Sequence, residues 1–300
     1  MAAFTPATEL LRVLEDVVER DQGAAYRINL QKVLPHIGDA YRGEDEGFRS
    51  HLGASVIGNE CARAIWYGFR WFTKPRFGGR MMRLFNRGHL EEGRFIALLL
   101  TAGIQIYQQD ENGKQFRISD VGGHFGGSGD GVAVGVPGVQ AGLPVLLEFK
   151  THNDKSFQKL KKEGVRVAKF EHYVQMTTYM RKMGLAVALY MAVNKNDDEI
   201  WAEFVGASNA MADQMIDRGR KIILMREPPE KINKSAGWFQ CSWCDHKPVC
   251  HLTGTPAVNC RTCVSSIAKE DGNWYCEHDT EEVLTKERQL AGCGRYEAIK

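Results

Sequence analysis

Hydrophobic residues recur at helical spacing over the first part of the chain, so residues 1–50 are expected to be helical. The apolar stripe there consists of Leu10, Leu11, Leu14, Val17 and Val18. Stretches with similar signals predict further helices at residues 55–72, 88–102, 168–183 and 207–225. Three of these stretches are followed by typical helix stops, namely Gly103, Gly184 and the pair Pro228 and Pro229.

Between these helices the pattern changes to that of strands separated by turns. Strands are predicted at residues 104–107, 115–119, 130–136, 145–150, 186–193 and 200–204. The order of helices, strand meander, helix and further strands is typical of an α/β or α+β core. From Cys241 onwards the composition shifts to cysteine, glycine and polar residues.

The 300 residues are 43% hydrophobic and 25% charged, which indicates a folded protein with a sizeable core. The formal net charge of +2 says little about partners. Basic residues concentrate in two stretches, 63–94 and 150–169. Such stretches beside an acidic metal site suit a polyanion, although a solvated helix face explains either stretch alone equally well.

No secretory signal or membrane span is recognisable in the sequence. Residues 1–21 read as an amphipathic helix with acidic residues, and the longest apolar run, 95–102, is too short to span a bilayer. We therefore expect a cytoplasmic protein with reduced thiols and no membrane partner. Its eight cysteines are better interpreted as metal ligands than as disulfides.

Acidic and basic residues surround one predicted hairpin. Asp130 opens a strand after a glycine-rich turn, and Glu148 and Lys150 lie two apart on the next strand, so they share a face. Two carboxylates on neighbouring strands can hold Mg²⁺ or Mn²⁺, with the Phe149 carbonyl as a further ligand. Lys150 would position a water or stabilise charge on phosphate oxygens. Taken alone, the pattern also fits ordinary surface charge.

Two helical pairs add to this group of residues. His89 and Glu92 are three apart and share a helix face, so a docked helix could present His89 as a metal ligand rather than as an exposed capping residue. Gln175 and Tyr179 are four apart on a later helix. They could contact the phosphate or base of a bound strand, or form an ordinary helix surface.

In chain order these residues form Gly-His-x-x-Glu, Gly-Asp-Gly, Glu-Phe-Lys and Gln-x-x-x-Tyr, and over residues 50–250 the sequence resembles the RecB-like PD-(D/E)XK nucleases. The resemblance implies catalytic roles for Asp130, Glu148 and Lys150. It implies Mg²⁺ or Mn²⁺ ligands at His89, Asp130, Glu148 and the Phe149 carbonyl, a variable acidic position at Glu92, and DNA contacts from Gln175 and Tyr179. Gly129 replaces the usual proline before the first aspartate, as is common in this branch.

The fold implied is α/β, with a restriction-endonuclease-like core whose mixed central sheet is flanked by helices. We expect a helical N-terminal extension at residues 1–50 and the nuclease core at residues 51–252. A small cysteine-rich, zinc-ribbon-like module should follow at residues 256–300.

The first cysteine group comprises Cys241, Cys244 and Cys250, which need a fourth ligand, and Cys61 is the only cysteine upstream. The stretch around Cys61 resembles that around the first cluster cysteine of iron–sulfur nucleases in this branch, which implies a 4Fe–4S cluster that ties residue 61 to residue 250. Spacing alone does not choose between iron–sulfur and zinc.

The second cysteine group is Cys260, Cys263, Cys276 and Cys293, four cysteines within 34 residues. Their spacing is typical of a zinc ribbon or knuckle, and too few apolar residues surround them for an independent core. A structural zinc ion would therefore supply the folding free energy, on the order of 10 kcal/mol or more. Such a module could contact DNA or a protein, or act as a structural cap.

We expect a metal-dependent DNA exonuclease of phage or mobile-element recombination or repair, with DNA and a recombination or helicase protein as partners. A structure- or sequence-specific endonuclease is the alternative within the nucleases. A nucleic-acid-binding scaffold with a degenerate metal site is the alternative outside them. Polarity, strand preference and oligomeric state are not encoded in any recognisable pattern.

Overall fold

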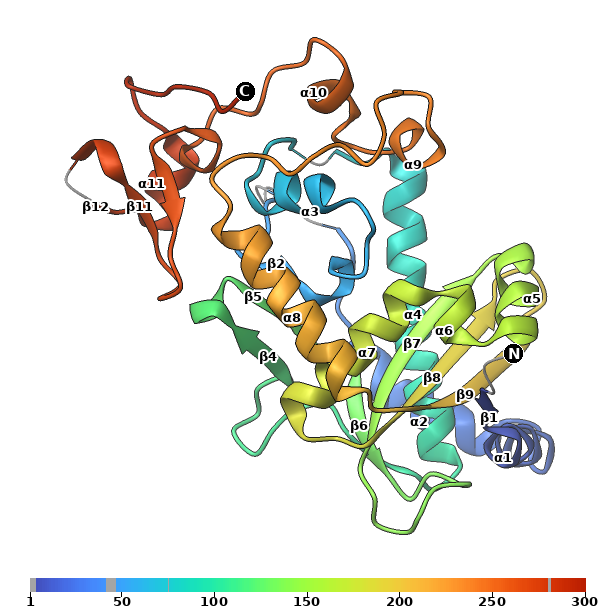
Figure 1. The fold of residues 1–300 in the computed structure, drawn as a ribbon. Helices are drawn as coiled ribbons and strands as arrows, with labels where there is room; N and C mark the ends of the chain where they lie inside the picture. Colours follow the sequence, from blue (N-terminus) through green and yellow to red (C-terminus); the bar gives the residue numbers. More distant parts are fainter. Residues whose placement is uncertain (1–3, 42–46, 75, 280–281) are drawn as a thin grey trace. The chain divides into compact units, whose positions relative to one another are not determined.

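The computed structural model (Figure 1) describes residues 4–41, 47–74, 76–279 and 282–300. The chain divides into two compact units. Unit 1 comprises residues 1–43, 77–118 and 128–212, and unit 2 comprises residues 44–76, 119–127 and 213–300. Each unit is thus assembled from three separate stretches, whereas the predicted domains are consecutive segments. None of the described helices is long and apolar enough to cross a membrane.

The core of unit 1 is a six-stranded sheet with the strand order β1-β9-β8-β7-β6-β3. The strands are β1 (Thr5–Pro6), β3 (Gln105–Tyr107), β6 (Gly131–Val134), β7 (Val145–His152), β8 (Val187–Asn194) and β9 (Ile200–Gly206). The β7–β8 pair is parallel, and the other neighbours are antiparallel. The sheet is therefore mixed, as the sequence predicted.

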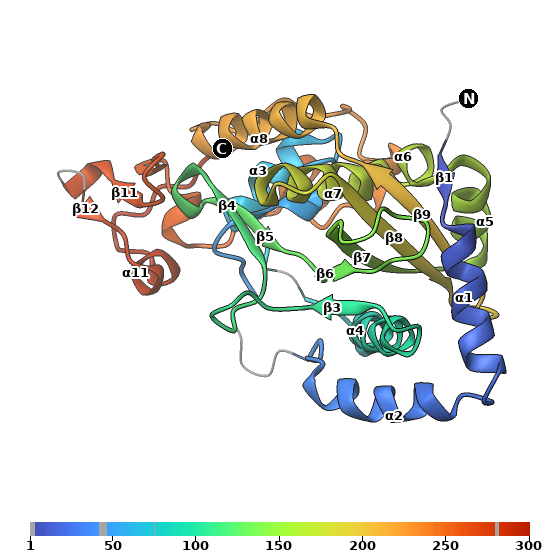
Figure 2. The ribbon, with the colours of Figure 1, turned by 90° about the horizontal axis from the view of Figure 1, so that it is seen from below.

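Helices lie on both faces of this sheet, as Figure 2 shows. One face carries α1 (Thr8–Glu19) and α4 (Gly79–Thr101), and α2 (Ala24–Val33) packs on α4. The other face carries α7 (Phe170–Met183), preceded by α5 (Asp154–Glu163) and α6 (Val165–Ala168). A central mixed sheet flanked by helices confirms that part of the expected fold class.

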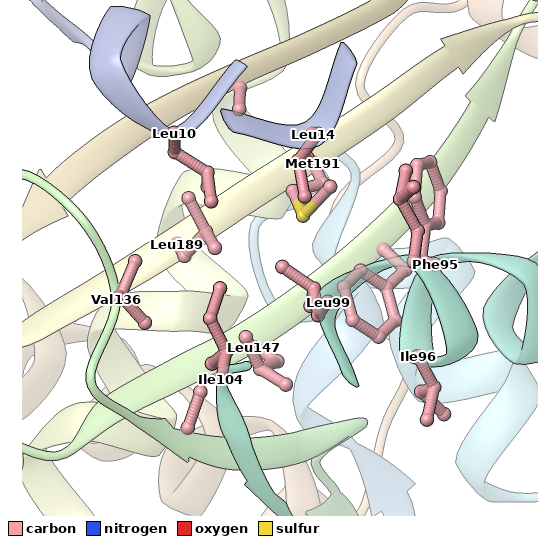
Figure 3. Close-up of a cluster of buried hydrophobic side chains, with 14 of the residues drawn as sticks. Leu10, Leu14, Phe95, Ile96, Leu99, Ile104, Val136, Leu147, Leu189 and Met191 are labelled. Atoms are coloured by element: carbon pink, nitrogen blue, oxygen red, sulfur yellow. The ribbon is translucent and has the colours of Figure 1, made fainter. Parts of the chain in front are cut away.

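The hydrophobic core of unit 1 lies between the sheet and helices α1 and α4 (Figure 3). Phe149 on β7 stacks on Phe95 of α4 with ring centroids 5.1 Å apart. The other labelled members of the cluster are Leu10, Leu14, Ile96, Leu99, Ile104, Val136, Leu147, Leu189 and Met191. Side chains alternate along a strand. Glu148 and Lys150, which alternate with Leu147 and Phe149 on β7, therefore face the opposite side of the sheet.

Unit 2 contains most of a small sheet of the order β2-β5-β4, together with helix α3 (Ala62–Phe69) and most of α8 (Asn209–Leu224). The strands are β2 (Leu52–Gly53), β4 (Arg117–Asp120) and β5 (Phe125–Ser128). Its C-terminal part holds α9 (Phe239–Ser242), α10 (Lys247–His251) and α11 (Lys286–Ala291). It also forms a three-stranded antiparallel sheet of β10 (Ser266–Ala268), β11 (Trp274–Cys276) and β12 (Glu282–Val283).

Two buried arginines join the C-terminal part of unit 2 to α3. Arg70 donates to the carbonyls of Arg261 and Ser266, at 3.0 Å each. Arg261 donates to the Phe69 carbonyl, and its guanidinium lies 3.7 Å from the centroid of the Trp71 ring. Gly122 and Gly272 also meet here so closely that a Cβ on either would lie about 2 Å from the other's backbone.

Several predicted boundaries were wrong. The helix predicted at 88–102 is α4 and begins at Gly79, so Gly88 lies inside it at the modest cost that a helical glycine carries. The segment predicted as a helix at 55–72 is helical only from Ala62 to Phe69, after a short 3-10 turn. Helix α5 and strand β5 were not predicted.

The predicted N-terminal helical region is two helices, broken at the left-handed Gly23, and it also contributes strand β1 to the sheet. Helix α1 buries Leu10 and Leu14 of the predicted stripe. Residues 1–3 and 42–46 of the predicted region lie outside the described residues.

Candidate functional site

A buried carboxylate on strand β7 forms the centre of the site in unit 1. Glu148 is fully buried, and Lys150, two positions further on the same face, donates to its Oε1 atom. The Gln175 side chain on α7 donates to Oε2 at 3.1 Å. Lys150 Nζ also lies 3.2 Å from the Phe149 carbonyl oxygen, the predicted backbone ligand. The glutamate is thus held from its own strand and from the covering helix.

Asp130 lies beside this group at the start of the neighbouring strand. The pairing of Gly131 with Leu147 continues so that the Phe149 N–H donates to Asp130 Oδ2 at 2.7 Å. Gly131 has φ +152°, and a Cβ there would lie 3.0 Å from the Tyr107 carbonyl oxygen. A glycine is therefore needed directly after Asp130, which accounts for the second glycine of the Gly-Asp-Gly pattern.

Helix α4 carries the two other predicted residues, Glu92 and His89, and both interact electrostatically with the acids of the sheet. Burial raises the pKa of the half-buried Glu92, and the charges of Asp130 and Glu148 raise it further, so all three carboxylates share one local field. Burial raises the pKa of Asp130, and the charge of His89, an exposed residue of α4, acts in the opposite direction. The structure thus brings all five side chains of the predicted metal and catalytic group into one region.

The carboxylates here resist ionisation. Burial raises the pKa of Glu148 to about 7, with Asp130 acting in the same direction and Lys150 against it. Burial, followed by the charge of Asp130, raises the pKa of Glu92 to about 7. Burial also raises the pKa of Asp130. Clustered carboxylates that share a poorly solvated region favour either protonation or a bound cation.

The lysine in this cluster is held in its charged form. Burial alone would lower the pKa of Lys150, but the nearby Glu148 and Asp130 carboxylates outweigh it and raise the pKa. The ammonium therefore stays protonated between the two acids. A fixed positive charge of this kind can stabilise negative charge that develops on a bound phosphate.

The two residues predicted to contact DNA are both buried in α7. Gln175 is 7% exposed and directs its amide to Glu148. Tyr179 is 2% exposed, so it offers little surface to a ligand. Gln175 therefore positions the carboxylate in this structure, and DNA contact by either residue stays a prediction.

The donor set fits a hard divalent cation in its chemistry, because it offers several carboxylates and a backbone carbonyl. Carboxylates with raised pKa values are the groups that such an ion would stabilise. Among the described residues, however, no group of three or more His, Cys, Asp and Glu side chains is arranged to hold a metal ion. Electrostatic coupling extends further than a metal–oxygen bond of about 2 Å, so the residues are neighbours without forming a closed ligand shell.

A second polar group, which was not predicted from the sequence, lies on the same face of the sheet. His152 follows Glu148 and Lys150 at the next alternate position of β7, and its Nε2 atom lies 2.9 Å from the Tyr190 hydroxyl of β8. His172 Nδ1 on α7 lies 2.9 Å from the same hydroxyl. The alternation of Glu148, Lys150 and His152 was a signal for His152, whereas no local pattern indicated the other two.

The first cysteine group lies in unit 2, near the N-terminus of α3. Burial raises the pKa of the Cys250 thiol, and Cys61 and Cys241 raise it further. Burial also raises the pKa of the Cys244 thiol, and Cys61 and Cys250 act in the same direction. The four thiols are therefore electrostatic neighbours, although none of the described groups is arranged to hold a metal. Iron–sulfur and zinc both stay predictions for this group.

The second cysteine group surrounds the small C-terminal sheet. Burial raises the pKa of the Cys260 thiol to about 11, with contributions from Cys293, Cys263 and Cys276. Cys260 Sγ lies 3.3 Å from the Arg288 carbonyl oxygen. These thiols are also neighbours without a closed ligand shell, so the zinc assignment is still a prediction.

The two basic stretches have different environments. Arg70 in the first is 1% exposed, so it cannot belong to a solvated surface for a polyanion. The second stretch contains α5, whose Lys155, Lys159 and Lys162 are exposed. An exposed basic face fits both readings of that stretch, a polyanion contact and a solvated helix.

The sequence matches no protein-family model, and a comparison with curated proteins finds no match. Among solved structures, the alkaline exonuclease LHK-Exo from Laribacter hongkongensis is similar with 16% identity and a TM-score of 0.42. Its complex with dAMP gives 14% identity and 0.40, and both alignments cover 58% of this chain and 86% of that one. SSO0001 gives 12% identity and 0.39, over 77% of this chain and 96% of that one. Likenesses this distant assign neither fold nor function.

Proposed function

We propose that the protein is a metal-dependent DNA nuclease that hydrolyses phosphodiester bonds at the site around Glu148, and that it acts as an exonuclease. The observation that supports this most is the arrangement of Glu148 and Lys150 on the polar face of β7, with Asp130 beside them immediately before β6. Acids with raised pKa values surround a lysine that stays charged. The order of the four sequence motifs supports the same proposal.

Magnesium or manganese would bind Asp130, Glu148, the Phe149 carbonyl and His89, with Glu92 as a further acidic ligand. The cation would supply Lewis acidity towards a phosphate oxygen. The residues themselves do the rest of the work. Gln175 fixes the orientation of Glu148, and the Lys150 ammonium neutralises charge that develops on the phosphate.

Structural clusters complete the proposal. Two metal groups would hold distant segments of unit 2 together. One is a 4Fe–4S cluster on Cys61, Cys241, Cys244 and Cys250, and the other is a zinc ion on Cys260, Cys263, Cys276 and Cys293. The resemblance of the motifs further supports a cytoplasmic role in phage or mobile-element recombination, alongside a recombination or helicase protein.

The test is incubation of the purified protein with end-labelled linear DNA and with closed circular DNA in Mn²⁺. An exonuclease degrades the linear DNA and leaves the circle intact. Cleavage of the circle would instead identify an endonuclease. Binding of DNA without cleavage of either substrate would identify a scaffold with a degenerate site and refute the proposal.

Two substitutions at the site control this experiment. Glu148→Gln and Lys150→Met should each lower the cleavage rate at least about 100-fold while the fold and DNA binding persist. Glu199→Gln and Lys32→Met, at exposed positions of unit 1, are the matched controls. Full activity of either site variant would show that the chemistry lies elsewhere.

A further inference from the structure

One hydroxyl group on the polar face of the sheet joins three elements of unit 1. Tyr190 on β8 is fully buried, and its oxygen lies 2.9 Å from His152 Nε2 on β7 and 2.9 Å from His172 Nδ1 on α7. His152 Nδ1 lies 3.0 Å from the Ser156 hydroxyl on α5. The chain of contacts thus runs from α7 through both central strands to α5.

The aromatic rings pack together as well as bonding. The ring centroids of His172 and Tyr190 lie 5.8 Å apart in a stacked arrangement, and those of His152 and His172 lie 6.0 Å apart. Burial lowers the pKa of His152 to about 4 and that of His172 to about 2, with Lys150 contributing to both. Both imidazoles are therefore neutral at physiological pH.

The hydrogen count of these groups fixes how they bond. A tyrosine hydroxyl has one proton, so it donates to one histidine and accepts an N–H from the other. If Tyr190 donates to His172, His152 carries its proton on Nε2 and accepts the Ser156 proton at Nδ1. In the opposite tautomers Tyr190 donates to His152 Nε2, His152 Nδ1 donates to the Ser156 hydroxyl, and His172 Nδ1 donates to Tyr190. Each of the three contacts is then still a hydrogen bond. The network is complete in either state, which a buried polar group requires.

The network lies beside the proposed active site. Tyr190 is the register partner of Glu148 on the parallel neighbouring strand. His172 lies three residues before Gln175, so both share the α7 face that meets the sheet. Gln175 donates to Glu148 from that face. The bonds from His172 to Tyr190 and from Gln175 to Glu148 therefore hold one helix against two neighbouring strands.

We infer that His152, Tyr190 and His172 are positioning residues for the proposed nuclease reaction, and that they hold α7 where Gln175 can orient Glu148. This inference rests on the proposed function. None of the three needs to touch the substrate. Their loss should lower turnover and cation affinity while DNA affinity stays the same, because the surface that binds DNA is unchanged.

The first test compares Tyr190→Phe with Tyr173→Phe in the full chain. Tyr190→Phe removes one oxygen and keeps the ring, and should lower kcat and Mn²⁺ affinity about 10- to 100-fold with KM for DNA within about twofold. Tyr173 lies on α7 beside His172, outside the network, so Tyr173→Phe should leave all three constants unchanged. A kcat of Tyr190→Phe within about twofold of the wild type would overturn the inference.

The second test identifies the nitrogen atoms and holds even if Tyr190→Phe fails to fold. An asparagine amide approximates Nδ1 and a glutamine amide approximates Nε2 of histidine. His172→Asn and His152→Gln should therefore retain most of the wild-type activity, whereas His172→Gln and His152→Asn should lose it. Equal activities within each pair would refute a role for these specific bonds.

Failure of the proposed function gives a different result from failure of this inference. A wild-type protein that cleaves no DNA in Mn²⁺ would refute the nuclease proposal. A wild-type protein that cleaves DNA, with network variants equally active, would refute the positioning role alone.

Discussion

Acidification should destabilise the protein through His152, which is 4% exposed on β7. Burial lowers the pKa of this imidazole from 6.5 to about 4, and the charges of Lys169, Lys195 and Lys150 act in the same direction. Below pH 6.5 His152 binds a proton in the unfolded chain, whereas in the folded protein it does not bind one until the pH falls to about 4. The stability at neutral pH that depends on a neutral His152 is therefore fully present above pH 6.5 and is lost as the pH falls towards 4.

The size of the effect follows from the two pKa values of His152. Linkage gives a loss in the free energy of unfolding of about 2 kcal/mol at about pH 5 and about 3 kcal/mol at about pH 4. This is a substantial part of the stability of an ordinary domain, which is about 5–15 kcal/mol.

Other buried groups titrate over the same range with both signs. His172, with its pKa lowered by burial to about 2, adds to the loss at low pH. Glu92 and Glu148, with pKa values raised by burial to about 7, take up protons more readily in the folded state and offset it. The pH dependence of the wild type alone therefore does not isolate His152.

The assay is urea unfolding of the wild type and of His152→Gln, monitored by circular dichroism at about pH 7, 6 and 5. Glutamine keeps an amide near the Nε2 position and does not titrate. The difference in unfolding free energy between the two proteins should change by about 2 kcal/mol over this range. The same substitution at the exposed His36 is the control and should show no such change. A constant difference for His152→Gln would refute the claim that burial keeps this imidazole neutral.

Three further outcomes are expected. Phe95→Ala removes the ring that stacks on Phe149 and should lower the free energy of unfolding by about 3–5 kcal/mol in urea, and a loss below about 1 kcal/mol would contradict the packing of α4 on β7. Replacing Lys155, Lys159 and Lys162 together by glutamine should weaken DNA binding and flatten its salt dependence, with the slope falling by about one unit for each lysine that binds a phosphate, as measured by fluorescence anisotropy. An unchanged slope would place the DNA away from α5. If the proposed 4Fe–4S assignment is correct, Cys250→Ser should remove the brown colour of the protein and reduce the yield of folded protein, and a folded, coloured variant would show that the four-cysteine grouping is wrong.

The acid and lysine group was predictable because a strand has a period of two residues. That period places Glu148 and Lys150 on one face, and the antiparallel β6–β7 pair brings Asp130 next to them. The resemblance, and not a local pattern, grouped His89 and Glu92 with these acids, and the helix that carries them begins nine residues before its predicted start.

The role of Gln175 could not be predicted in the same way. Helical spacing placed it on a face of α7 but did not say whether that face meets solvent, DNA or the sheet. The structure packs it against β7, where its amide reaches Glu148. Burial then decides the chemistry of the carboxylate, because the raised pKa of Glu148 arises first from its removal from water.

The sequence by itself determined the local alternation that puts polar residues on one face of β7 and Leu147 and Phe149 on the other. Only the tertiary structure decided which distant polar residues meet on that face. Tyr190 lies 38 residues from His152 and 18 from His172, and the three join through the parallel β7–β8 register and the helix packed over it. Periodicity describes a single element, whereas register and helix docking depend on the free energy of packing the whole core.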